Sequence, residues 1–382
     1  MTDPRQQKGP PEDHEAERED QIFARLSHRI RGARANPSKL RWDSPYLVSQ
    51  AEDFWERHLG DLVTDGLLLG VARRHGLSPF MSLLGEVNTY SQPLALGYIQ
   101  LSGHINNLAL TAWKPASART QPKIQALVQL HARSIVLLEE ILLLTFSGYP
   151  SGATTISRTL QEVRVTARFL HRFEALLSER FLASHIVDLW QSKADLRPRG
   201  SASRSSAWKA TEKELDERYE EVLRKYGPSI SIPNGWAWPR MQGRYGNGGK
   251  LPRRIPFSQL QAAAGIRFDR ERYRQSSHRV HGGRLGAIQT LHGHEPEVAL
   301  LGPRPNGLTD SAIVAIHDAQ DITESLLRSC GRFHDDESIY WWLEALDQLS
   351  HVLRGMLSDA QSSLDYVFQD DVDSEGPSRE EA

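Results

Sequence analysis

Apolar side chains recur every three or four residues over several long segments of the chain. This spacing is typical of amphipathic helices, because it places the apolar side chains along one face. We expect the first helix to run from Ser44, which can cap it, to about Arg74. Further helices are predicted over residues 122–146, 152–173, 182–190, 212–226, 309–329 and 337–368.

Proline and glycine mark where the helical pattern breaks. The apolar pattern over residues 80–113 contains Pro93, which has no amide hydrogen to donate inside a helix, so we expect two shorter helices there. Residues 147–151 read Ser-Gly-Tyr-Pro-Ser and contain the glycine and proline that turns favour. The segments on either side of this turn are therefore predicted to form a helical hairpin.

One long segment, residues 228–256, is crowded with glycine and proline and has no acidic residue. A loop of this length is uncommon in a compact domain unless it is functional or disordered, and its two tryptophans argue against plain disorder. Residues 197–206 are predicted to be a flexible loop, and residues 298–307 a short strand and turn. The expected fold class is mainly α: a multi-helix bundle with one long loop containing Gly, Pro and Trp, and at most a short β-hairpin.

The two ends of the chain are polar and charged. We expect residues 1–42 to be a largely disordered arm and residues 369–382 an acidic disordered tail, because few apolar side chains are available for burial. Between them, residues 43–120 are predicted to be an N-terminal helical segment. Residues 121–368 are predicted to be a central and C-terminal helical bundle.

Composition points to a cytoplasmic protein. The chain has one cysteine, Cys330, and begins with polar residues where a signal peptide would need an apolar stretch. The longest apolar stretch, residues 134–146, is interrupted by two glutamates and is shorter than the roughly 20 residues that cross a membrane. We therefore expect no association with a membrane.

Charge is distributed unevenly along the chain. The formal net charge is −2, yet residues 240–284 contain eleven Arg and Lys residues and two acids, Asp269 and Glu271, a local charge of +9. Such a segment can collect a nucleic-acid backbone, and tryptophans beside it can stack on bases. The predicted nucleic-acid-binding residues are Arg240, Arg244, Lys250, Arg253, Arg254, Trp236 and Trp238.

Two familiar kinds of site are not supported by the residue pattern. The glycine-rich segment 243–250 ends in Lys250, but Leu251 stands where a Walker sequence has Ser or Thr, so a flexible loop is the better interpretation. Four side chains that could ligate a metal match no specific spacing: His281, His292, His294 and Glu295. We expect no metal and no cofactor.

The densest group of chemically active side chains lies between Arg272 and His281. On a helix, Arg274, His278 and His281 would share one face. Histidines exchange protons near neutral pH and arginine binds phosphate through two hydrogen bonds, so this face could cleave RNA without a metal. A histidine would accept the proton of the ribose 2′-hydroxyl while Arg272 or Arg274 stabilises the phosphate. The alternative is that these side chains cap and solvate a helix end.

Arg158 and Glu162 stand four residues apart on a predicted helix and can pair. A solvated pair would be structural, whereas a buried pair would indicate part of a site. We include both residues among the candidate catalytic residues.

The central part of the sequence resembles a family of helical bacterial proteins of unassigned function. The resemblance covers residues from about 127 to 283. It is carried by Arg133, Glu139, Gly148, Arg158, Glu162 and the pattern Tyr273-Arg274-x-x-Ser277-x-x-x-His281. It implies a helical bundle with a shared polar site.

The chain is also similar to the HEPN helical superfamily, whose ribonuclease members carry Arg followed after four to six residues by His. Arg272 with His278 and Arg274 with His281 both fit. The polar residue that usually follows the Arg is Tyr273 in the first match and Gln275 in the second, which favours the pair Arg274 and His281. The similarity implies a homodimer with facing sites.

Two functions remain open from the sequence. One is a metal-independent RNA-cleaving or RNA-binding protein in stress or antiviral defence. The other is a non-catalytic helical module that binds a protein partner through the same basic segment.

Overall fold

The computed structural model describes residues 78–113, 120–197, 205–245, 251–267, 305, 307–330 and 338–373. All regular secondary structure in these ranges is helical, which confirms the predicted mainly α fold. The chain divides into two compact units, Met1–Leu83 and Leu84–Ala382. The helix predicted at 44–74 and the strand predicted at 298–301 lie outside the described residues. None of the described helices has the length and apolar character needed to cross a membrane.

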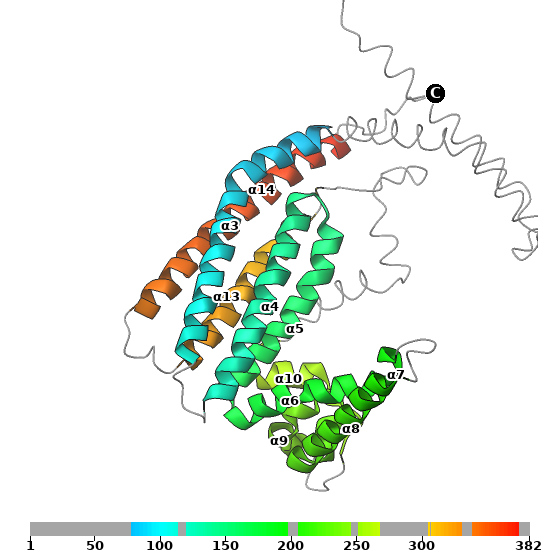
Figure 1. The fold of residues 1–382 in the computed structure, drawn as a ribbon. Coiled ribbons are helices and arrows are strands. Elements are labelled where there is room, and N and C mark those ends of the chain that lie inside the picture. The colour runs from blue at the N-terminus through cyan, green and yellow to red at the C-terminus, as the bar shows by residue number, and fades with distance from the viewer. Residues whose placement is uncertain are drawn as a thin grey trace, which may run out of the picture. The chain divides into compact units, whose positions relative to one another are not determined.

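Five long helices build the larger part of the second unit, which includes α3 from Leu84 onward (Figure 1). They are α3 (Ser78–Trp113), α4 (Gln121–Phe146), α5 (Pro150–Arg172), α13 (Asp310–Ser329) and α14 (Ser338–Asp373). Helices α4 and α5 pack against each other and against α13, which also contacts α14. Helix α14 continues beyond the predicted end near Phe368.

Helix α3 is continuous through Pro93, so the prediction of two shorter helices was wrong. Contacts hold the helix on both sides of the proline: the Asn88 amide donates to the Phe146 carbonyl at 2.9 Å, and the Tyr98 hydroxyl donates to the Ile316 carbonyl at 3.4 Å. Pro93 itself is exposed, so the backbone hydrogen bond that it cannot make is lost at the surface. Tertiary packing therefore outweighs the local preference to break.

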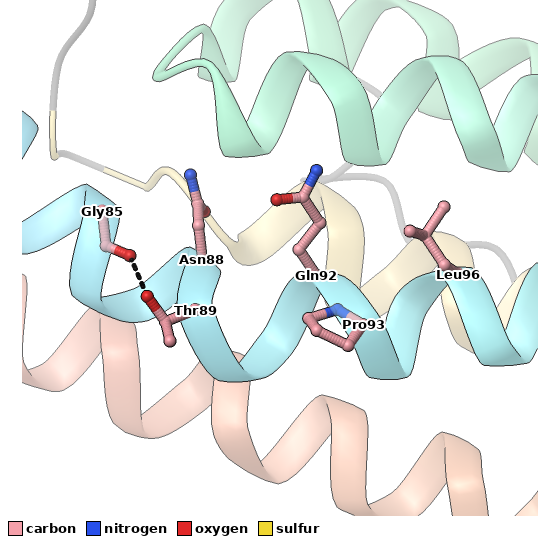
Figure 2. A pocket seen from close by; sticks show the side chains of 6 residues that line it. All are labelled: Gly85, Asn88, Thr89, Gln92, Pro93 and Leu96. Atoms are coloured by element: carbon pink, nitrogen blue, oxygen red, sulfur yellow. Dashed lines mark hydrogen bonds between the residues drawn. The ribbon is translucent and has the colours of Figure 1, made fainter.

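A shallow hollow lies along the exposed side of α3 (Figure 2). Its volume is about 380 Å³, and its lining residues are Gly85, Asn88, Thr89, Gln92, Pro93 and Leu96. All six come from this one helix and none is charged. The hollow therefore brings no charged groups together.

The predicted hairpin of α4 and α5 is confirmed. Its turn contains Gly148 at φ 83°, a conformation that glycine adopts without the steric cost of a side chain. After α5 ends at Arg172, the backbone is extended at Phe173, and α6 (Ala175–Gln191) begins two residues later. The predicted break before the helix at 182–190 is therefore present, although α6 starts earlier than predicted.

The segment after α6 forms helix α8, of 21 residues, and several short helical segments, most of which pack on α6, on α8 or on one another. They are α7 (Lys193–Leu196), α8 (Ser206–Tyr226), η3 (Pro228–Ser231), η4 (Gly235–Ala237), α9 (Trp238–Met241), η5 (Gln242–Tyr245) and α10 (Phe257–Ala263). Helix α8 ends where Gly227 adopts φ 76°. Much of the predicted long loop is thus a series of helical turns.

Arg180 of α6 holds these turns in place. The side chain is 3% exposed and donates to the carbonyls of Trp236, Tyr226 and Gly235 at 2.8–3.0 Å, and to the Ser229 hydroxyl at 3.0 Å. Burial lowers the pKa of its guanidinium. A side chain at Gly235 would collide with the Ser229 carbonyl, since its Cβ would lie 1.9 Å from that oxygen. The hydrogen bonds of buried Arg180 therefore stabilise a segment that lacks a long regular helix, and Gly235 permits the close approach of its backbone to Ser229.

His131 lies in the centre of the bundle, completely buried between α3 and α13. Its Nδ1 is 3.0 Å from Asn106 Oδ1 and its Nε2 is 2.9 Å from Thr323 Oγ1. Burial lowers the pKa of His131 from 6.5 to about 4, because a charged imidazole would lose its hydration there. Both ring nitrogens are engaged, so we interpret His131 as a structural residue.

The lowered pKa of His131 predicts a loss of stability in mild acid. The unfolded chain takes up this proton near pH 6.5, whereas the folded chain takes it up only near pH 4, so stability is complete above pH 6.5 and falls between these values. The full loss from this group is about 3 kcal/mol. Urea unfolding at pH 7, 5.5 and 4.5 should give a steeper decline for wild type than for His131→Gln. Equal slopes would contradict the prediction.

Candidate functional site

Five of the residues predicted from the sequence to act at a site lie outside the described residues: Arg272, Arg274, His278, His281 and Lys250. The same holds for His292, His294 and Glu295. Among the residues that the structure does describe, no three His, Cys, Asp or Glu side chains converge as a metal site. A candidate site is formed instead by side chains where α5 and α13 end.

The candidate catalytic pair Arg158 and Glu162 lies on α5. Arg158 Nε is 3.8 Å from Glu162 Oε1, and the side chains are 19% and 50% exposed. The predicted contact along one helix face is thus present, with the carboxylate half in water. Pairs of this kind contribute about 0.2–0.5 kcal/mol.

The two tryptophans predicted to stack on bases occupy different environments. Trp236 is 6% exposed, and its ring meets Phe169 and Phe181 edge-on at 5.3 and 5.4 Å. Trp238 is half-buried, and its ring lies 5.5 Å from that of Tyr245. In this structure Trp236 is a core side chain covered by other rings, which leaves Trp238 as the tryptophan that a base could reach.

The described arginines of the predicted nucleic-acid-binding set are all exposed. These are Arg240, Arg244, Arg253 and Arg254. Arg240 belongs to α9, where its guanidinium carbon lies 4.6 Å from the centre of the Phe173 ring. The turns after α8 therefore present arginine side chains to solvent.

A seam of polar contacts joins α5 to α13 along their length. Near the start of both helices, the Thr154 and Ser311 hydroxyls are 2.8 Å apart, and near their ends His171 Nδ1 is 2.7 Å from Ser329 Oγ. Helices α5 and α13 therefore run in the same direction. A seam of this kind within an apolar core ties the relative position of the two helices to specific side-chain pairs.

Four charged residues occupy the middle of the seam. Arg164 donates to Asp318 at 2.8 Å and also pairs with Asp321, which accepts a further hydrogen bond from Arg168. Asp318 is completely buried and Asp321 is 7% exposed. Each carboxylate thus has a guanidinium partner, as the burial of charge requires.

His171, at the outer end of the seam, is half-buried and differs from His131 in its hydrogen bonds. Ser329 Oγ is also 2.8 Å from the Ser325 carbonyl; when its one hydrogen goes to that carbonyl, His171 Nδ1 carries the proton and donates to Ser329 Oγ. Within the described part of the chain, no hydrogen-bond partner lies at His171 Nε2. In that tautomer, Nε2 has a lone pair that can accept a proton.

Positive charge surrounds His171. Burial is the main cause that lowers its pKa, and Lys123, Arg168 and Arg328 lower it further, opposed by Glu324. Lys123 donates from Nζ to the His171 carbonyl at 3.1 Å, and burial lowers the pKa of its ammonium group. The imidazole is therefore neutral at physiological pH and lies in a positive field, which suits contact with an anion.

The next residues along the chain add an aromatic ring flanked by two cations. The Phe173 ring is half-buried and lies edge-on to Phe169 at 4.7 Å. Arg240 and Arg172 lie 4.6 and 5.9 Å from the Phe173 centroid, both on exposed side chains. Neither arginine forms an ion pair with a described carboxylate. Among the described residues, no carboxylate therefore competes with an outside anion for these two guanidinium groups.

Comparison with known proteins gives a match to one family over part of the chain and no activity. Residues 125–297 match a family of unknown function, DUF5677. This match supports the resemblance to an uncharacterised helical family inferred from residues 127–283. Searches of curated proteins and of solved structures gave no match.

The part of the chain that is similar to DUF5677 includes α4 from residue 125 onward, all the helices from α5 to α10, and the segment with Arg272 and His281. His171, Arg172 and Phe173 lie within it. Helix α13, which supplies Ser329 and the buried aspartates, lies after it. The polar seam therefore joins the DUF5677-like region to a helix outside the match.

Four residues of the site were not predicted from the sequence: His171, Lys123, Arg172 and Phe173. One signal was present: Arg164, Arg168 and His171 follow each other at helical spacing, on a helix whose opposite positions are apolar. A polar stripe on a helix with neighbours on several sides needs buried partners. The partners Asp321 and Ser329 lie more than 150 residues away along the chain, which no local pattern reveals.

Proposed function

We propose that this protein binds single-stranded RNA at a surface formed by Arg172, Phe173, Trp238, Arg240 and Tyr245, here called the Phe173 surface. The observation that carries the proposal is the pair of arginines on the Phe173 ring, neither of them paired with a described carboxylate. Guanidinium groups bind phosphate in a fixed two-bond geometry. Aromatic rings beside them stack on bases, a combination typical of proteins that bind single strands.

Charge along the chain supports this function. The described arginines 244, 253 and 254 are exposed, and they belong to the segment 240–284 with its local charge of +9. Counterions released from a nucleic-acid backbone would add affinity that does not depend on base sequence. A protein partner is the alternative occupant, and it would need an acidic surface.

We further propose that the protein cleaves the RNA that it binds. Cleavage is supported by the sequence pattern of Arg274 and His281, by the similarity of that pattern to HEPN ribonucleases, and by the chemistry of histidine beside arginine. A homodimer with facing sites and a role in defence belong to the same hypothesis.

Binding is tested by fluorescence anisotropy with labelled single-stranded RNA over 50–300 mM salt. Replacing both Arg172 and Arg240 by alanine is expected to weaken binding about tenfold to a hundredfold. The slope of log affinity against log salt should fall by about 1.4, the value for two lost contacts to a single-strand backbone.

A matched control removes two cations elsewhere. Lys213 and Arg218 lie on α8 with side chains 78% and 55% exposed, so the variant Lys213→Ala/Arg218→Ala has the same change in net charge. This control should bind RNA as wild type does. An equal loss of RNA affinity in both variants would show that only net charge matters and would contradict RNA binding at the Phe173 surface. Binding of polyglutamate as tight as that of RNA would instead favour the interaction module.

A further inference from the structure

Among the described histidines, His171 combines three properties that proton transfer needs. It is neutral near physiological pH, its ring is oriented by a defined hydrogen bond to Ser329, and its Nε2 has no partner among the described residues. His131 is also neutral, but both of its nitrogens are engaged in the core. His185, on α6, is exposed and its Nδ1 lies 2.6 Å from the carbonyl of Leu182.

Lys123 brings a second group that can exchange a proton to the same place. Its ammonium is held 3.1 Å from the carbonyl of His171, and only one of its three hydrogens is used by that contact. Partial burial removes water from the Lys123 ammonium group and lowers its pKa, and the nearby carboxylate of Glu174 opposes this shift. A lysine in this state donates a proton more readily than a fully hydrated one.

Two further cations lie beside this pair. The side chains of Arg168 and Arg328 are 38% and 58% exposed, and each already pairs with one carboxylate, Asp321 and Glu324 respectively. Guanidinium groups have five N–H donors, so both retain donors for an incoming phosphate. Arg172 and Phe173 follow His171 directly, which places the group at the edge of the Phe173 surface.

We propose that His171 and Lys123 are the catalytic base and acid of a metal-independent cleavage of the RNA that binds at the Phe173 surface; the proposal rests on the proposed function. His171 Nε2 takes the proton of a ribose 2′-hydroxyl, and the 2′-oxygen forms a bond to the adjacent phosphorus. The bond from phosphorus to the 5′-oxygen breaks, and the Lys123 ammonium donates a proton to that oxygen. The products are a 2′,3′-cyclic phosphate and a 5′-hydroxyl, and exchange with water restores both side chains.

Ser329 is the positioning residue of this mechanism. In the tautomer with the hydrogen on His171 Nδ1, the Ser329 hydroxyl accepts that hydrogen and leaves the lone pair on Nε2. Loss of the hydroxyl should therefore slow the reaction less than loss of the imidazole and should change its dependence on pH. The wild-type rate should rise with pH as His171 loses its proton, below the ordinary value of 6.5, and fall in alkali as Lys123 loses its own.

The test uses the full chain in EDTA with labelled single-stranded RNA, and it measures cleavage and binding separately. Binding is measured by anisotropy on the same sequence with 2′-deoxyribose, which cannot be cleaved by this route. Changing His171→Asn or Lys123→Met should lower the cleavage rate about 10²–10⁴-fold while binding changes less than threefold. The control His185→Asn should retain the wild-type rate. Ser329→Ala should shift the acid limb of the pH profile.

The outcomes separate the two proposals. Absence of RNA binding by wild type overturns the proposed function and this inference with it. Binding without cleavage, or cleavage that His171→Asn leaves unchanged, overturns the inference alone. Cleavage lost in Arg274→Ala and His281→Ala but retained in His171→Asn assigns the chemistry to the segment predicted from the sequence. Folding of each variant is checked by its urea midpoint, since His171 also bonds to α13.

Discussion

Replacing Arg180 by methionine is expected to lower the free energy of unfolding by about 3–5 kcal/mol. The guanidinium satisfies three carbonyls and one hydroxyl, and three of these four acceptors belong to the buried residues Ser229, Gly235 and Trp236. Methionine restores part of the buried volume but donates no hydrogen bond, so these acceptors stay unsatisfied. Each buried acceptor left alone costs about 1–3 kcal/mol, and relaxation of the turns limits the total.

Urea unfolding followed by circular dichroism measures the Arg180 effect. The control Arg218→Met removes an exposed arginine of α8 that pairs with Glu214 at 3.7 Å, and it should change stability by less than about 0.5 kcal/mol. Hydrogen exchange should also become faster over residues 226–237 in Arg180→Met, because these turns lose their common donor. A loss of unfolding free energy below about 1 kcal/mol would show that the turns are stable without the Arg180 hydrogen bonds.

Replacing Asp321 by alanine is expected to destabilise the protein by about 3–5 kcal/mol. Asp321 is the shared partner of Arg164 and Arg168, and it is 7% exposed. Its removal leaves Arg164, whose side chain is 15% exposed, with Asp318 alone. A buried charge that loses part of its compensation costs more than the pair contributed when intact.

The control for Asp321 is an exposed pair on the same helix. Glu324 accepts from Arg328 at 2.7 Å with side chains 41% and 58% exposed, so Glu324→Ala should cost at most about 1 kcal/mol. A double-mutant cycle between Asp321→Ala and Arg168→Met should give a coupling energy of about 0.5–3 kcal/mol. Additive effects would mean that Arg168 and Asp321 act independently, contrary to the geometry.

Helix positions were largely predictable from the sequence, and α3 shows where prediction failed. The hairpin of α4 and α5 follows from apolar spacing and from the turn residues around Gly148. Pro93 was expected to end a helix, yet α3 continues because Asn88 and Tyr98 are anchored on either side of it. A local rule estimates the cost of one backbone hydrogen bond, whereas the outcome depends on contacts with distant helices.

The candidate site was less predictable than the fold. The exposed arginines after α8 could be named from charge alone, because a run of cations without acids stays at the surface. Trp236 was predicted to stack on bases because it lies beside this basic segment, but its ring fills the core between Phe169 and Phe181. Tryptophan serves both purposes, and only its neighbours decide between them.

The amino-acid sequence by itself determined the helical class of this protein, the hairpin of α4 and α5, and the concentration of positive charge after residue 240. These properties depend on residues close together in the chain, through helix periodicity, turn chemistry and local charge. Only the tertiary structure decided that His171 bonds to Ser329, that Arg164 and Arg168 share Asp321, and that Arg180 binds the turns around Trp236. Those contacts join residues up to 158 positions apart, and packing of the helices brings them together.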